Sequence, residues 1–205
     1  MSESSKTENR IIPLDELVAE IDAETLGTGE EETADSRQDI AEKLSGHEQY
    51  IRFYLEDIQL AIPLSSAIEI GNRPNITTLP NLPDWVLGVS NIRGEVISMV
   101  ELKTFFGLQL TKKRYIPASQ KMTIIVRNED MKVGMIVDRV MGIFYLDRSD
   151  KDIQKSPYEE AKSELISYIS GVVAPGESSE ENLMNILDIN KLLSSQRMNA
   201  FRSEK

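Results

Sequence analysis

The feature that most constrains the fold of this chain is an internal repeat. Residues 57–70 align without a gap with residues 130–143, so that a turn acid, a polar residue and an apolar alternation coincide. Residues 96–106 then align with residues 183–193, where both copies have an apolar stretch, an acid and a closing apolar pair. Two blocks in the same order predict two copies of one supersecondary unit. Each copy is small for an independent core, so we expect two subdomains related by an approximate twofold axis, with an apolar interface.

Both copies are rich in short stretches with a period of two residues, which is typical of β-strands. Polar clusters at residues 56–57 and 128–130 separate neighbouring stretches and indicate hairpin turns. Many short strands divided by turn residues predict an all-β fold, built as small barrels or a sandwich. The expected strands are residues 50–55, 58–62, 67–70, 95–102, 122–127, 132–137, 142–146, 169–174 and 183–187.

Only short helices are expected between these strands. Pro83 suits the first position of a one- or two-turn helix, and Gly88 suits its end. Asp188 can cap a last helix through residues 190–193. A further helical turn can begin at Ser156.

The acidic charge is concentrated at the N-terminus. Residues 1–48 hold 14 acidic and 4 basic residues, a net charge of −10, whereas residues 49–205 hold 20 and 19, a net charge of −1. We expect residues 1–46 to be a largely disordered extension, because they contain no aromatic residue to bury. Apolar residues at helical spacing indicate a possible helix at residues 14–26, either transient, packed on the body or docked in a partner's groove. A nearly neutral body argues against binding to nucleic acid.

The composition removes several classes of active site. The chain has no cysteine and one histidine, His47, which stands between a glycine and a glutamate with no partner pattern. This excludes disulfides, thiolate metal sites and a cysteine nucleophile, and we expect no cofactor, no metal and no catalysis. No apolar run approaches the ~20 residues of a membrane span, so we expect a cytoplasmic protein without direct membrane insertion.

One polar motif interrupts two apolar stretches. Asn91, Arg93 and Gly94 form an Asn-x-Arg-Gly sequence in which the glycine permits a tight turn. A partly buried arginine needs a carboxylate, and Glu69 at the end of the third expected strand is the candidate. The pair is either a structural ion pair without a contact role or one that shapes a partner-binding surface.

Four ordered blocks of this chain resemble the CheW family, the adaptors of bacterial chemosensory arrays. The most specific block is residues 79–107, which contains the Asn-x-Arg-Gly motif. Residues 133–143, 168–172 and 185–193 resemble three further blocks of the family. The resemblance runs over most of the body and indicates a domain at residues 47–195, followed by a tail at residues 196–205.

The resemblance implies two intertwined five-stranded barrels, no catalysis and two protein partners. The family couples the cytoplasmic tip of a methyl-accepting receptor to the regulatory domain of a CheA-type histidine kinase. By position, Ala67 and Ile70 match a kinase-facing strand, while Arg93 and Glu69 match the family's ion pair. Gly134, Val140 and Ile143 match the groove side of the second barrel. The full set implied to bind partners is Ala67, Glu69, Ile70, Asn91, Arg93, Gly94, Met122, Gly134, Val140 and Ile143.

Some features depart from the family's pattern and leave the pathway open. Glu101 stands where aspartate is commoner, Ser98 and Met99 stand where a proline-containing pair is usual, and the acidic extension is long. The implied adaptor could serve flagellar chemotaxis, a type IV pilus pathway for twitching or phototaxis, or could bind the receptor without activating the kinase. Outside the family, an enzyme acting in a cleft between barrels and a nucleic-acid-binding barrel are the rival hypotheses.

Overall fold

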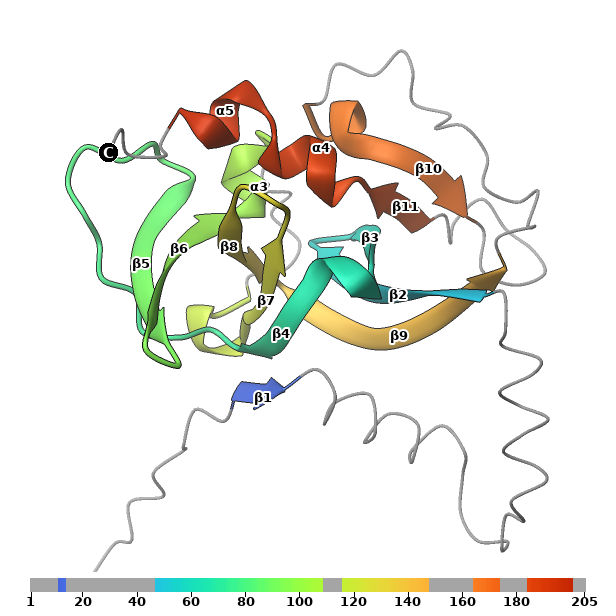
Figure 1. Cartoon of the computed structure of the whole chain (residues 1–205), viewed down its shortest axis with the longest axis horizontal. Helices are drawn as coiled ribbons and strands as arrows, with labels where there is room; N and C mark the ends of the chain where they lie inside the picture. Colours follow the sequence, from blue (N-terminus) through green and yellow to red (C-terminus); the bar gives the residue numbers. More distant parts are fainter. Residues whose placement is uncertain (1–10, 14–46, 109–115, 148–163, 174–183, 201–205) are drawn as a thin grey trace, which may run out of the picture.

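The computed structural model describes residues 11–13, 47–108, 116–147, 164–173 and 184–200, which form a strand-dominated molecule (Figure 1). Its first strands are β1 (Ile11–Pro13), β2 (His47–Leu55), β3 (Ile58–Pro63), β4 (Ala67–Asn72), β5 (Val86–Ile92) and β6 (Glu95–Glu101). The later strands are β7 (Met122–Arg127), β8 (Lys132–Val137), β9 (Arg139–Asp147), β10 (Ile169–Val173) and β11 (Met184–Leu187). The helical segments are α3 (Leu102–Phe105), α4 (Ile189–Leu193), α5 (Gln196–Asn199) and the 3₁₀ turns Leu64–Ser66, Ala118–Gln120 and Glu164–Tyr168.

The strands form two sheets with the same arrangement of five strands. Sheet A has the order β1-β4-β7-β8-β6-β5, and sheet B has the order β10-β11-β3-β2-β9. Without β1, both are five-stranded, and each contains one parallel pair at the equivalent place, β6 with β8 and β11 with β3. The expected all-β fold with two five-stranded units and short helices is therefore confirmed.

The two repeats exchange their hairpins. Hairpin β2–β3 comes from the first repeat but pairs with β9 and β11 of the second. Hairpin β7–β8 of the second repeat pairs with β4 and β6 of the first. Neither sheet can therefore form from one repeat alone, and long-range contacts dominate the topology.

The core has three parts that follow from this exchange. A central cluster takes fully buried residues from both sheets, among them Phe53 of β2 and Ile124 of β7, and confirms the expected apolar interface. A second cluster lies in sheet B around Met184 and Ile186. A third lies in sheet A around Ile97 and Met99, which are the repeat partners of that pair. The buried positions thus obey the same twofold relation as the strands.

The expected helix opening at Pro83 is wrong. Residues Val86–Ile92 form strand β5, paired antiparallel with β6. Every second position of β5 is buried, which is the burial pattern of a strand. At Gly88 the φ angle is 136° and a Cβ would lie 2.1 Å from the carbonyl oxygen of Thr77, so this glycine allows two backbone segments to touch rather than ending a helix.

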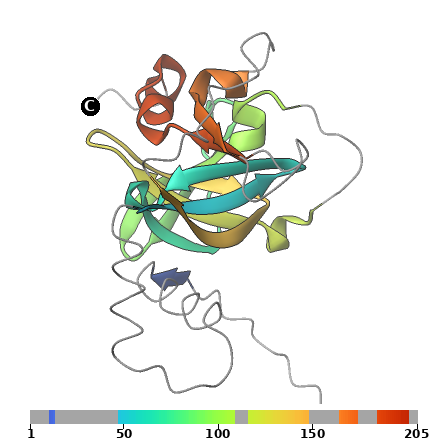
Figure 2. The ribbon, with the colours of Figure 1, turned by 90° about the vertical axis from the view of Figure 1, so that its right-hand side faces the viewer.

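The expected N-terminal extension at residues 1–46 and the expected C-terminal tail at residues 196–205 each contribute a short element to the fold, β1 and α5. Residues 11–13 form strand β1 on the outer edge of β4, which makes sheet A six-stranded. In both views helices α3, α4 and α5 lie at one end of the molecule and β1 at the other (Figure 2). At the C-terminal end, the Asp188 cap is confirmed, since its Oδ1 accepts a hydrogen bond from the Lys191 N–H at 2.9 Å. Met198 of α5 is fully buried in the central cluster.

The possible helix at 14–26, the extension's expected disorder and the turn at Ser156 lie outside the described residues.

Candidate partner-binding site

The Asn-x-Arg-Gly motif forms the two-residue turn of hairpin β5–β6. Arg93 and Gly94 have φ angles of 52° and 83°, and Ile92 pairs with Glu95 across the turn. Two successive positive φ angles are the signature of a type I′ hairpin turn, which favours Asn-Gly over Arg-Gly. The Asn91 side chain accepts a hydrogen bond from the Gly94 N–H at 2.9 Å and fixes the turn. The arginine therefore holds a conformation that costs a non-glycine residue roughly 1 kcal/mol or more.

The predicted ion pair between Arg93 and Glu69 is confirmed. Arg93 Nε lies 3.2 Å from Glu69 Oε1, and the exposed fraction is 57% for the arginine side chain and 8% for the glutamate. The carboxylate belongs to β4 and is buried, whereas the guanidinium projects from the hairpin tip. The ion pair thus holds the positive charge of Arg93 at the surface, because the buried carboxylate of Glu69 fixes the position of the guanidinium.

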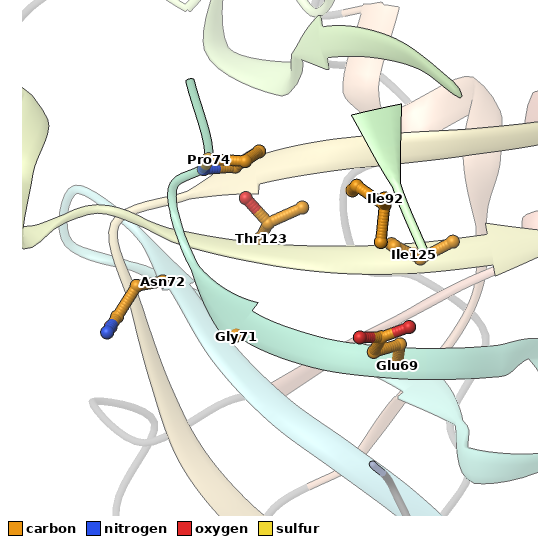
Figure 3. A pocket seen from close by; sticks show the side chains of 7 residues that line it. All are labelled: Glu69, Gly71, Asn72, Pro74, Ile92, Thr123 and Ile125. Atoms are coloured by element: carbon orange, nitrogen blue, oxygen red, sulfur yellow. The ribbon is translucent and has the colours of Figure 1, made fainter. Parts of the chain in front are cut away.

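A small cavity lies beside Glu69 (Figure 3). Its volume is about 10 Å³, which is close to the minimum for one water molecule. The buried Thr123 Oγ1 makes no hydrogen bond within the described part of the chain, and Glu69 Oε1 contacts Arg93 without hydrogen-bond alignment. The lining residues are Glu69, Gly71, Asn72, Pro74, Ile92, Thr123 and Ile125.

Thr123→Val is expected to leave the free energy of unfolding unchanged or to raise it by up to about 1 kcal/mol, because it removes a buried hydroxyl without a partner. Thr123→Ser, which keeps the hydroxyl and loses a methyl group, is the control and should cost roughly 1 kcal/mol. Urea unfolding of the two variants measures both changes. A larger loss for valine than for serine would mean that the hydroxyl is bonded, for instance through a water in the cavity.

The strand expected to face the kinase buries the side chains implied to make that contact. Ala67 and Ile70 are 8% and 2% exposed and belong to the central cluster. Met122, which pairs with Asn72 at the start of β7, is half-buried and packs on the same cluster. A partner on β4 would therefore meet the backbone edge of the strand rather than these side chains.

The remaining implied residues lie on two different strands. Gly134 of β8 is buried, and a Cβ there would lie 2.5 Å from Met99 Cε, so this glycine makes room for the sheet A core. Val140 and Ile143 of β9 are half-buried against the central cluster. Between them Met141 is 42% exposed. The structure thus brings Glu69, Asn91, Arg93 and Gly94 together on sheet A and places the β9 pair on sheet B.

A buried ionic cluster was missed by the sequence analysis. Lys103 of α3 places its Nζ 2.6 Å from Asp138 Oδ2 and 3.5 Å from Glu56 Oε1. Asp138 Oδ2 also accepts a hydrogen bond from the Glu56 N–H at 2.6 Å. The cluster joins the β2–β3 turn, the link from β8 to β9 and helix α3, and so connects the two sheets.

The twofold relation between the repeats predicts a second set of positions equivalent to this cluster, but the ionic residues are not repeated there. The residues that align with Asp138 and Lys103 in the other copy are Ser65 and Asn190. This difference between the two repeats is the feature of the sequence from which the ionic cluster could have been predicted. Beside the cluster lies a hollow of about 170 Å³ lined by Tyr54, Glu56, Ile116, Gln120, Asp138 and Arg139. The described residues contain no group of three or more acidic or histidine side chains placed to hold a metal ion. None of their helices has the length and apolar character needed to cross a membrane.

Comparison with known proteins gives a consistent result. Residues 49–197 match the CheW-like domain family. The chain is 28% identical over 163 residues to the chemotaxis protein CheW of Helicobacter pylori, covering 80% of this chain and 90% of that protein. It is 32% identical over 110 residues to protein PilI of Pseudomonas aeruginosa, covering 54% and 58% of the two chains. Protein FrzA of Myxococcus xanthus is 25% identical over 162 residues, covering 78% and 94%.

The fold is also similar to a solved structure. The scaffolding protein TtCheW from Thermoanaerobacter tengcongensis superposes with a TM-score of 0.60 at 20% identity, covering 74% of this chain and 90% of that one. At this identity the match supports the two-sheet architecture.

Proposed function

This chain belongs to the family of CheW-like domains, and on that basis we propose that it is a non-enzymatic scaffold of a bacterial chemosensory array. It would join the cytoplasmic tip of a methyl-accepting receptor to the regulatory domain of a CheA-type histidine kinase. It would act in the cytoplasm at membrane-associated arrays, without inserting into the membrane or binding nucleic acid.

The observation that carries the proposal is the Arg93–Glu69 pair. A strained turn holds an exposed guanidinium over a buried carboxylate, and the Asn91 side chain fixes that turn. Such an arrangement offers a partner a fixed charge with little loss of side-chain entropy on binding. Charge at this place gives register and selectivity, whereas apolar contacts give most of the affinity.

The second contact would use β9. Val140 and Ile143 are half-buried and Met141 is exposed, so this strand combines a rigid backbone with an adaptable apolar side chain. A helical receptor tip would place its apolar face there. Because the central cluster packs both sheets together, a partner held by sheet A and another held by sheet B would keep a fixed relation.

The output pathway is a separate question. The relatives named CheW, PilI and FrzA are all 25–32% identical to this chain, so identity does not select one of them. An adaptor of a type IV pilus pathway and a receptor-binding competitor that leaves the kinase inactive are the alternatives.

A pull-down from the native lysate with the full chain as bait, followed by mass spectrometry, tests the proposal. The expected result is recovery of one histidine kinase and one methyl-accepting receptor, whose genes identify the pathway. Arg127→Glu changes the charge of an exposed arginine on β7, outside the motif, and serves as the matched control for Arg93→Glu. Recovery of neither partner by a folded bait would contradict the adaptor role.

A further inference from the structure

The outer edge of β4 is occupied by the chain's own N-terminal segment. One side of β4 pairs with β7, and the other pairs antiparallel with β1 in the register Ile11 to Gly71, Ile12 to Ile70 and Pro13 to Glu69. The three paired β4 residues are buried, and Glu69 is the carboxylate that holds Arg93. The added strand therefore pairs with the strand residue that anchors Arg93 in the candidate site.

In the other repeat no described strand pairs with the equivalent sheet edge. The strand equivalent to β4 is β9, which ends sheet B, and no strand of the described residues pairs with its outer edge. Since the two sheets otherwise match strand for strand, β1 is an addition to the shared architecture rather than part of it.

The pairing is short and ends at a proline. Three residues of β1 take part, and Pro13 has no N–H to donate and closes the strand. A short edge strand with proline protects a sheet edge from pairing with other chains. Three residues also supply few backbone hydrogen bonds to hold it in place. Residues 14–46 connect β1 to β2, and 33 residues can span at most about 110 Å when extended. The segment can thus leave β4 and stay attached to the protein.

We propose that the outer edge of β4 is a strand-binding surface, that residues 11–13 occupy it in the free protein, and that an extended strand of the kinase regulatory domain binds there by displacing them. The identity of the partner rests on the proposed function, whereas the occupied edge does not. The proposal accounts for the burial of Ala67 and Ile70, because a strand that adds to an edge is bound through backbone hydrogen bonds.

Occupancy is tested on the protein alone. The chain has no cysteine, so Arg10→Cys gives a single site for a nitroxide spin label next to β1. In the labelled chain we expect broadened amide signals from Gly71 and Asn72 of β4, and unchanged signals from β10 and β11. The additional double substitution Ile11→Gly and Ile12→Gly should abolish the broadening, because glycine disfavours the strand. A mixture of labelled chain with ¹⁵N chain distinguishes pairing within one molecule from exchange between two. Absence of broadening at β4, or broadening only between molecules, would overturn the proposal.

Displacement is tested with two deletions. Removing residues 1–10 leaves β1 in place, and removing residues 1–13 deletes it, yet both remove two acidic and two basic side chains. If β1 covers the edge about 90% of the time, its deletion should raise the affinity for the regulatory domain about tenfold, whereas the shorter deletion should have no effect. Equal affinities for all three chains would overturn the competition. Binding of the domain to none of them would contradict the proposed function, and the spin label alone would then decide whether β1 occupies the edge.

Discussion

Arg93→Glu is expected to weaken binding of the receptor tip or of the kinase regulatory domain at least tenfold, which is about 1.4 kcal/mol. The substitution places a carboxylate beside Glu69, whose side chain is only 8% exposed. The two negative charges repel each other, and the surface charge presented by the hairpin changes sign. Titration calorimetry with each partner measures the effect, and the partner whose affinity falls is the one that contacts the turn.

Two further variants test whether Arg93 contributes to partner binding or only to the conformation of the turn. Arg93→Asn creates the Asn-Gly pair that type I′ turns prefer, and this gain offsets part of the cost of leaving the buried Glu69 carboxylate without its cation. The variant should therefore stay folded while binding is still lost. Arg127→Glu makes the same charge change on another exposed arginine and should leave binding within about twofold of wild type. If Arg93→Asn binds like the wild type, Arg93 serves the fold alone and the proposed contact role is wrong.

Lys103→Met is expected to lower the free energy of unfolding by about 3–5 kcal/mol. The lysine side chain is 10% exposed and its main partner, Asp138, is 2% exposed. Without the ammonium group, Asp138 and Glu56 are two neighbouring carboxylates in a poorly hydrated site. Because the cluster links the sheets, the loss should appear as one cooperative transition at lower urea concentration.

The matched control is Lys132→Met, which breaks an ion pair with Glu95. That pair is far more exposed, with 29% and 55% of the two side chains accessible, so its loss should cost less than about 1 kcal/mol. Adding Asp138→Asn to Lys103→Met should recover part of the stability, since the amide oxygen can still accept the Glu56 N–H. Equal losses for the two lysine variants would contradict the role assigned to burial.

The strands that the sequence predicted best are those that the repeat and the alternation support together. Residues 122–127 and 132–137 coincide with β7 and β8, and the acidic turn before residue 58 separates β2 from β3. The Arg93–Glu69 pair could also be predicted from the need of a charged side chain for an opposite partner, although in the structure the buried member of the pair is Glu69 and Arg93 is exposed. Local rules and a strict repeat are sufficient for such features.

The failures arise from tertiary contacts. Pro83 and Gly88 resemble the ends of a helix, but the backbone contact between Gly88 and Thr77 places this segment in a sheet. The exchange of hairpins leaves no trace in a repeat, since both arrangements use the same strands, and only the family resemblance, which implied intertwined barrels, indicated it. Lys103 and Asp138 meet only because α3 and the β8–β9 link converge. The strand at residues 11–13 has no alternation of its own and depends on the open edge of β4.

The most direct test of the adaptor role is kinase activity in a reconstituted ternary complex. Receptor-containing membranes and the purified kinase are mixed with the full chain, and the rate of kinase autophosphorylation is followed. We expect that the chain raises this rate only when receptor is present, and that Arg93→Glu removes the stimulation while Arg127→Glu does not. Binding of both partners without stimulation would identify a competitor, and no binding of either would contradict the claim that this chain couples receptor to kinase.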